Sequence, residues 1–144
     1  MGGNRFQHVA LVGKPAAGIG PVIEQIRDFL RQQGCQVSLE RQGALERAVD
    51  QYRKALEIQP DFSTARNRLG ITLNRLGRHA EATVEFREAV RQKPDQAFLY
   101  NNLGFSLYLE GNYPQAEQAF QRALALKPGF ARAGMNLGLT LGRQ

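Results

Sequence analysis

The chain has 144 residues, of which 42% are hydrophobic and 22% are charged, and its formal net charge is +6. This balance excludes a disordered chain, and no apolar run reaches the roughly 18 residues of a membrane span. The chain has no run of five Lys or Arg, so nothing predicts nucleic-acid binding. A single cysteine, Cys35, excludes an internal disulfide and a Cys-rich zinc site. We expect a cytoplasmic protein that binds neither nucleic acid nor membrane.

The first 42 residues predict a strand, a helix and a second strand. Residues 6–13, "FQHVALVG", form a short apolar run that ends in glycine, as a buried strand does. From Pro21 to Gln33 the apolar residues fall at helical spacing, and Gly34 is expected to end that helix. The alternation in "CQVSLE", residues 35–40, predicts the second strand. Residues 1–42 are therefore expected to form a β-α-β unit with two parallel strands.

The loop within "ALVGKPAAGIGPV", residues 10–22, shares glycines with phosphate-binding loops but not their full patterns. A P-loop needs Gly-Lys-Ser/Thr, whereas Pro15 follows Gly13-Lys14, and the dinucleotide fingerprint needs three spaced glycines where two are present. Pro21 also lacks the backbone amide that would bind an anion at the helix start. The sequence predicts a structural turn and no cofactor.

The sequence shows no catalytic or metal-ligating constellation. His8 and His79 are the only histidines, and neither has metal-ligand or triad spacing around it. Acidic residues of the predicted helices alternate with Arg and Lys, as on solvated ion-pairing faces. We therefore expect no catalytic residues, no metal and no enzyme activity.

The segment from Arg5 to Gln42 resembles the N-terminus of bacterial NAD kinases. The resemblance rests on the apolar strand, the Gly-x-Pro loop, the helix that ends near a glycine and the closing strand of "RFQHVALVGKPAAG…IEQIRDFLRQQGCQVSLERQ". The Gly-Gly-Asp-Gly motif that carries the phosphate chemistry of that family is absent from this chain. The resemblance implies an alternative function, a nucleotide-binding remnant without kinase activity.

Three prolines, Pro60, Pro94 and Pro128, lie 34 residues apart, and other residues recur in step with them. A fixed period of this kind indicates stacked helical repeats. The residues in register are Leu69-Gly70, Leu103-Gly104 and Leu137-Gly138; Leu73, Leu107 and Leu141; Ala82 and Ala116; Phe86 and Phe120; Ala89 and Ala123; and, before Pro60, Ala48, Tyr52 and Ala55. The pattern resembles the tetratricopeptide repeat, an antiparallel helix pair, over residues 43–144.

The resemblance implies a helical array of four parts. These are a lone second helix at 44–58, full repeats at 62–93 and 96–127, and a lone first helix at 130–143. The recurring Gly70, Gly104 and Gly138 are expected to let paired helices approach closely, and Gly77 and Gly111 to form the turns between them. Asp61 and Asp95 are expected to cap the helices that follow them. With the β-α-β unit, the fold class predicted for the whole chain is α+β.

In tetratricopeptide proteins the first helix of each pair lines a concave face where peptides dock. The resemblance therefore implies a protein or peptide partner, and four arginines without an acid between Arg66 and Arg78 favour an acidic one. The residues expected on this face are Asn67, Arg68, Ile71, Asn74, Arg75, Phe98, Asn101, Asn102, Phe105, Tyr108, Arg132, Met135 and Asn136, with Thr64, Leu109 and Leu139 beside them.

A structural role for part of this face is an open alternative. Two full pairs give a shallow groove, and Asn102 and Asn136 occupy positions where the family favours Asn for helix packing. The carboxylate-clamp pattern of the family is matched at Asn102 and Arg132. Asn67, Ile71 and Asn136 depart from it.

Two unlike segments that meet without a linker at Gln42-Gly43 predict an artificial or recombined chimera, with natural fusion or a mispredicted gene as alternatives. Two parallel strands would leave unpaired edges, and the helix at 130–143 has an uncovered apolar face. The sequence therefore predicts a scaffold or protein-interaction module that self-associates, as a homodimer through the strand edges or the C-terminal helix.

Overall fold

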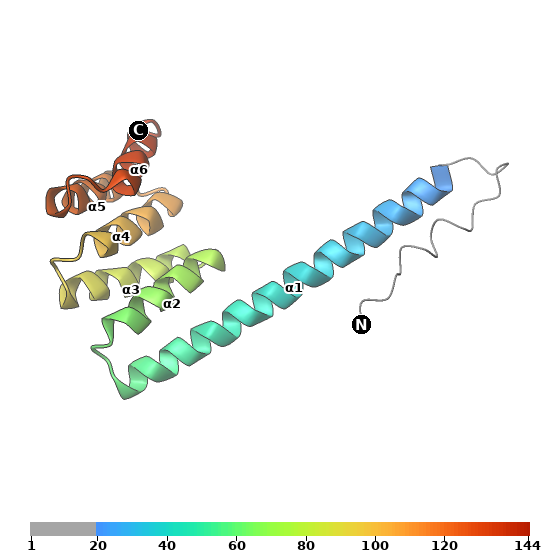
Figure 1. Ribbon diagram of the computed structural model, residues 1–144, viewed down its shortest axis with the longest axis horizontal. Coiled ribbons are helices and arrows are strands. Elements are labelled where there is room, and N and C mark those ends of the chain that lie inside the picture. Colours follow the sequence, from blue (N-terminus) through green and yellow to red (C-terminus); the bar gives the residue numbers. More distant parts are fainter. Residues whose placement is uncertain (1–19) are drawn as a thin grey trace. The chain divides into compact units, whose positions relative to one another are not determined.

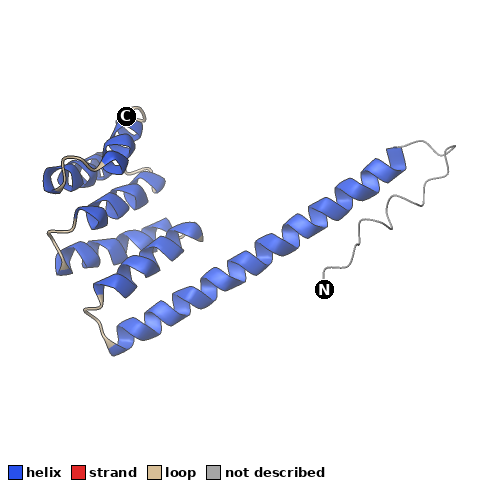
Figure 2. Cartoon of the chain, in the orientation of Figure 1, coloured by secondary structure: helices blue, strands red, loops and turns tan. Residues whose placement is uncertain are grey.

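The computed structural model describes residues 20–144 and shows six helices (Figures 1 and 2). They are α1 (Gly20–Ile58), α2 (Ser63–Arg75), α3 (His79–Gln92), α4 (Ala97–Leu109), α5 (Tyr113–Leu126) and α6 (Ala131–Leu141). The described residues contain no strand. None of these helices is long and apolar enough to cross a membrane.

The predicted α+β class is wrong for the described residues, because "CQVSLE" lies inside α1 rather than in a strand. Gly34 does not end the helix: a helical glycine costs about 1 kcal/mol relative to alanine, and the surrounding Gln, Arg, Leu and Glu residues favour the helix. A strand at 35–40 would also need a larger covered sheet, since a parallel pair is not stable alone. The strand predicted at 6–13 and its loop lie outside the described residues, apart from the start of α1.

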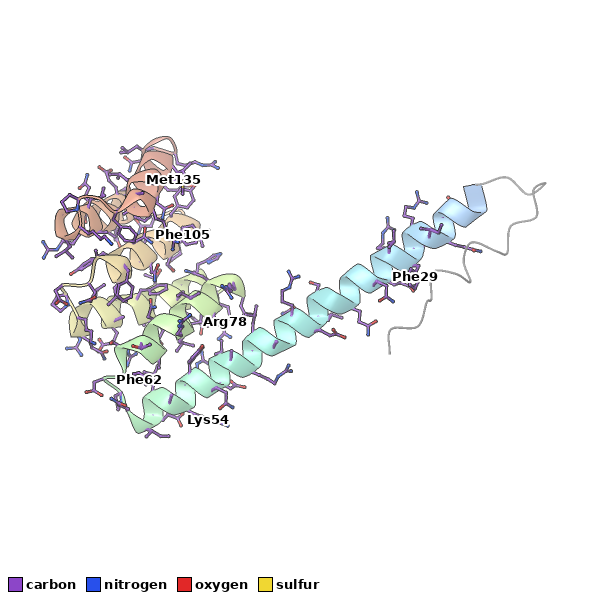
Figure 3. All side chains as sticks on the ribbon, in the orientation of Figure 1. Phe29, Lys54, Phe62, Arg78, Phe105 and Met135 are labelled. Carbon is purple, nitrogen blue, oxygen red and sulfur yellow. The ribbon has the colours of Figure 1, made fainter. Side chains whose placement is uncertain are left out.

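The chain divides into two compact units, Met1–Gln42 and Gly43–Gln144, and the division falls within α1. In the first unit, the described side chains are exposed, including Ile26, Phe29 and Leu30 (Phe29 is labelled in Figure 3). These apolar residues form the helical stripe that the sequence predicts, but it is not buried. The strand edges proposed for self-association are therefore not present at residues 35–40.

The second unit is built from helix pairs that follow the 34-residue period. Helices α2 to α6 contact one another in chain order, as Figure 1 shows. Their core is one cluster of buried residues to which Val49 of α1 also contributes. Its members are Val49, Leu69, Leu73, Ala82, Phe86, Leu103, Leu107, Ala116, Ala119 and Phe120.

Two of the three recurring glycines, Gly70 and Gly104, allow the paired helix to approach closely, as expected, and an aromatic ring packs over each. A Cβ at Gly70 would lie 2.7 Å from the Phe86 ring, and a Cβ at Gly104 would lie 2.7 Å from the Phe120 ring. Both distances are far below van der Waals contact, so only glycine allows the second helix of each pair to pack this closely. The 34-residue period in the sequence therefore reflects the packing of each glycine against an aromatic ring of the paired helix.

The predicted turns are confirmed and the predicted caps are wrong. Gly77 and Gly111 have φ angles of 77° and 80°, a left-handed conformation that ends α2 and α4 at little cost for glycine. The N-cap residues of α2 and α4 are Phe62 and Gln96, and neither helix has a side-chain cap. Asp61 and Asp95 lie one residue too early to take that position. The Asn112 side chain, by contrast, caps α5 by accepting from the backbone N–H of Gln115 at 3.4 Å.

Candidate peptide-binding surface

The first helices of the successive pairs, α2, α4 and α6, contact one another along one side of the second unit. Most of the residues expected on the concave face are exposed or half-buried there, and Figure 3 labels Phe105 of α4 and Met135 of α6. The exposed ones are Arg68, Arg75, Phe98, Phe105, Arg132 and Met135; the half-buried ones are Asn67, Ile71, Asn74, Asn102 and Tyr108. Asn101 and Asn136 are buried.

A groove of about 520 Å³ lies across these three helices and contains no acidic side chain. Its polar lining comes from amides, one imidazole and two guanidinium groups, and its apolar lining includes Phe105. The lining residues are Ile71, Asn74, Arg75, His79, Phe86, Asn102, Phe105, Leu109 and Arg132. Six of the thirteen residues in the main predicted set are thus brought together, and Leu109 joins them.

The remaining predicted residues lie outside this groove. Asn67, Thr64 and Phe98 line a separate cavity of about 170 Å³ with Lys93 and Gln96. Tyr108, Asn136 and Leu139 line a narrow cleft of about 20 Å³ together with Phe105. Arg68 and Met135 line none of these cavities.

Four asparagine side chains form a chain of amide hydrogen bonds across the three helices. Asn136 donates to Asn101 at 3.1 Å, Asn101 donates to Asn102 at 3.4 Å, and Asn102 donates to Asn67 at 2.9 Å. These hydrogen bonds give the buried amides of Asn101 and Asn136 a partner, without which their burial would cost free energy. These bonds join α2, α4 and α6, so Asn102 and Asn136 do have a packing role.

A second polar network lies at the groove and includes His79, around which the sequence shows no metal-ligand or triad spacing. His79 is the first residue of α3, and its Nδ1 lies 3.0 Å from Asn74 Oδ1. The buried Ser106 hydroxyl lies 3.1 Å from both Asn74 Oδ1 and the His79 carbonyl. Thr83 donates to Ser106 at 3.0 Å and also contacts Glu110. The network fixes the Asn74 amide and the imidazole at the groove wall.

Ion pairs separate the arginines into two classes. Arg66 contacts Glu85 at 2.8 Å, and Arg78 contacts Glu81 at 2.7 Å and Glu46 at 3.2 Å. These arginines are therefore already neutralised. The cationic residues on the concave side, Arg68, Arg75 and Arg132, form no ion pair with any residue that the structure describes.

The acidic groups with shifted pKa values lie on α3 and face arginines of their own unit. A hydrogen bond from Arg78 holds the pKa of Glu81 below its ordinary range. A hydrogen bond from Arg91 lowers the pKa of Glu88 to about 2. Neither acid lines the groove. The described residues also contain no cluster of His, Cys, Asp or Glu that would hold a metal ion.

Two family models match the helical part of the chain. The model described as "Tetratricopeptide repeat" matches residues 61–128, and the model described as "TPR repeat" matches residues 41–77. The chain contains tetratricopeptide repeats (TPRs). The matched residues include Gly70 and Gly104 with the rings that they seat, so the family pattern and the packing agree.

Several solved structures are similar to this chain over 72–79% of its length. A crystal structure of MamA is 27% identical with a TM-score of 0.67, and the match covers 72% of this chain and 60% of MamA. An O-GlcNAc transferase mutant from Thermobaculum terrenum is 29% identical with a TM-score of 0.64, covering 72% of this chain and 20% of the transferase. The first TPR of Spaghetti (RPAP3), bound to the HSP90 peptide SRMEEVD, has a TM-score of 0.67 at 21% identity, covering 79% and 89% of the two chains, and shares the fold.

Part of the chain is also similar to a curated protein, an NAD kinase of Delftia acidovorans, strain DSM 14801 / SPH-1. It is 42% identical over 55 aligned residues, which cover 33% of this chain. The match spans 18% of the NAD kinase. This likeness concerns a small part of the enzyme and does not by itself give the TPR chain its activity.

Proposed function

We propose that the TPR unit is a non-enzymatic protein-interaction module, whose groove between α2, α4 and α6 binds an acidic peptide segment. The observation that carries the proposal is the acid-free groove with Arg75 on α2 and Arg132 on α6, neither of which is ion-paired within the described residues. Charge-assisted bonds from guanidinium groups to carboxylates are about twice as strong as neutral hydrogen bonds. Phe105 of α4 also lines the groove and offers apolar contact.

The RPAP3 domain supports this class of partner, because its structure holds the HSP90 peptide SRMEEVD. The mode of binding is proposed to differ from a carboxylate clamp. The Asn67 and Asn102 side chains are hydrogen-bonded to each other, and Asn136 is buried in the chain of amide hydrogen bonds. Acidic side chains of the partner, met by Arg75 and Arg132, are therefore the proposed anchors in place of a terminal carboxylate.

The test measures binding of fluorescein-labelled peptides by anisotropy, starting with SRMEEVD and a panel of apolar-acidic peptides with free or amidated C-termini. Reversing both groove charges, Arg75→Glu with Arg132→Glu, is expected to weaken binding at least about tenfold, or roughly 1.4 kcal/mol. The matched control is Arg87→Glu with Arg122→Glu, which makes the same charge change at exposed sites on α3 and α5. The control is expected to bind as the natural chain does.

Equal loss in both variants would show general charge attraction and contradict a groove site. So would the failure of the whole acidic panel to bind at about millimolar peptide, where even a weak site of about 4 kcal/mol is half occupied. Loss of binding only when the C-terminus of the peptide is amidated would instead favour a carboxylate clamp.

The nucleotide-binding alternative rests on the NAD kinase likeness. Its loop falls mostly outside the described residues, and the sequence holds no Gly-Gly-Asp-Gly motif. A saturable ATP or NAD titration that is lost on Gly13→Ala with Lys14→Ala would favour it. We propose the chimera as the account of both likenesses, with a seam at Gln42-Gly43 between an NAD kinase-like segment and the TPR array. The cytoplasmic location stays a prediction.

A further inference from the structure

Each complete helix pair buries one recurring face of its first helix. On α4 this face is Leu103, Gly104 and Leu107, and it is buried beneath α5, whose Phe120 ring occupies the space above the glycine. The same face of α2 is buried beneath α3 in the same way. The covering helix always carries Ala, then an aromatic residue four positions later, then Ala three positions after that.

The equivalent face of α6 is only partly covered. It consists of Leu137, Gly138 and Leu141, which we call the α6 face; Leu137 is half-buried against the core, and Gly138 and Leu141 are exposed. A Cβ at Gly138 would meet no atom within 4 Å, and Leu141 is 51% exposed, whereas its equivalent Leu107 is 3% exposed. The opposite side of α6 is occupied, because Ala133, Asn136 and Thr140 are buried. Within residues 20–144 no helix takes the place of α3 or α5 on α6.

The matching half of such an interface lies at the other end of the repeat array. Ala48, Tyr52 and Ala55 of α1, which we call the α1 face, have the same spacing as the covering residues of α3 and α5. Their equivalents on α3 and α5 are at most 1% exposed, whereas these three are only half-buried. Glu46 and Arg53 contact α3 through Arg78 and Glu81, so the α3 side of this α1 segment is already used.

We infer that the α6 face of one copy binds the α1 face of a second copy, with Tyr52 of the second copy seated over Gly138. The two faces are the separated halves of the interface that this chain builds twice internally. Gly138 provides the space that an aromatic ring fills at Gly70 and Gly104, and Tyr52 provides a ring at the corresponding position. Covering both faces removes exposed apolar area, which drives association.

Such a contact is heterologous, since two different surfaces meet. Heterologous contacts continue into rings or open filaments rather than stopping at a symmetric dimer. The groove residues Arg75 and Arg132 belong to neither face, so the inference is independent of peptide binding. It predicts that the average mass of the full chain rises with concentration beyond that of a dimer.

The test uses the full chain and blocks one face at a time, with mass measured by sedimentation velocity and light scattering. Gly138→Arg fills the α6 face, and its folding is expected to be intact because a Cβ there meets open space. Ala48→Arg blocks the α1 face, with Ala55→Arg as a second variant where circular dichroism shows that Ala48→Arg is misfolded. The control is Met135→Arg, which places the same charged side chain on the exposed concave side of α6.

Each blocked variant alone is expected to be a monomer, and the control is expected to associate as the natural chain does. An equimolar mixture of the two blocked variants is expected to form a dimer and no larger species, because each variant keeps one free face. Four results would overturn the inference. The first is a natural chain that is monomeric at every concentration, and the second is a mixture that stays monomeric. The third is an Ala48→Arg variant that still dimerises, because two α6 faces would then be in contact. The fourth is association that Phe29→Glu with Leu30→Glu abolishes while Gly138→Arg leaves it unchanged.

Discussion

A glycine in the middle of a helix has opposite effects on stability at different positions of this repeat. At Gly104 the absent side chain makes room for the Phe120 ring, whereas at Gly138 the same absence leaves open space. Both positions carry the usual conformational cost of a helical glycine, about 0.5–1 kcal/mol relative to alanine. The neighbour, and not the backbone, decides which effect prevails.

Replacing each glycine by alanine tests this account. Gly104→Ala places a Cβ 2.7 Å from the Phe120 ring, and the overpacking is expected to lower the free energy of unfolding by about 1–3 kcal/mol. Gly138→Ala is expected to raise it by about 0.5–1 kcal/mol, because only the helix propensity changes. Urea unfolding monitored by circular dichroism, at a concentration where the chain is monomeric, measures both. Stabilisation by both substitutions would show that the aromatic ring shifts freely.

Charge at the residue scale was predictable in part. The run of arginines from Arg66 to Arg78 correctly points to a basic side of α2, but sequence alone does not show which of them are neutralised. Arg66 and Arg78 have partners 19 and 32 residues away, on α3 and α1. Such long-range pairs depend on how the helices stack. The sequence alone therefore does not show which arginines stay unpaired in the groove.

At the scale of elements, the amide chain joins the three helices that line the groove. Asn101 lies at its centre, where it accepts from Asn136 and donates to Asn102. Its side-chain carbonyl therefore bonds to α6, while its amine bonds to Asn102 of its own helix, and Asn102 in turn bonds to Asn67 of α2. The repeat period assigns all four asparagines to the first helices of their pairs, but the sequence does not show that Asn101 and Asn136 are buried.

Removing the centre of this chain is expected to destabilise the array. Asn101→Ala leaves the buried Asn136 amide without its acceptor, which costs about 1–3 kcal/mol. Asn67→Ala, at the half-buried end of the chain, is the control and is expected to cost less because water replaces the lost bond. In a double-mutant cycle, Asn101→Ala with Asn136→Ala is expected to cost less than the sum of the two single changes. Strict additivity would show that the bond does not couple α4 to α6.

The helix pairs were predictable because their periods are carried by residues that touch each other, such as Gly70 with Phe86. The strand at 35–40 was not, because alternation over six residues also fits a surface helix, and the described side chains there are exposed. Residues such as Gln36, Leu39 and Glu40 are exposed on α1, so no burial pattern constrains them. His79 was missed because its role comes from Asn74, a residue that precedes the turn.

At the scale of the whole molecule, helix α1 belongs to two units that differ in how their helical structure is held. From Gly43 onward α1 contributes Val49 to the buried core. The described side chains of residues 24–42 are exposed, so that helical segment rests on its backbone hydrogen bonds and local pairs such as Arg27 with Glu24. A surface ion pair of this kind contributes at most about 1 kcal/mol.

Amide hydrogen exchange is expected to report this difference directly. Opening of an isolated helix is local and cheap, whereas exchange at buried positions requires most of the unit to unfold. In dilute solution, amides of residues 24–42 are expected to exchange orders of magnitude faster than those around Leu103 and Phe120, which are buried in the core. Mass spectrometry of peptides from a timed exchange series measures both segments in one sample.

Amides around Val49 provide the comparison within the same helix, and they are expected to be protected like the core. Equal protection of residues 24–42 and α5 would contradict a division of α1 into two units. It would show instead that the exposed stripe of Ile26, Phe29 and Leu30 is covered in solution.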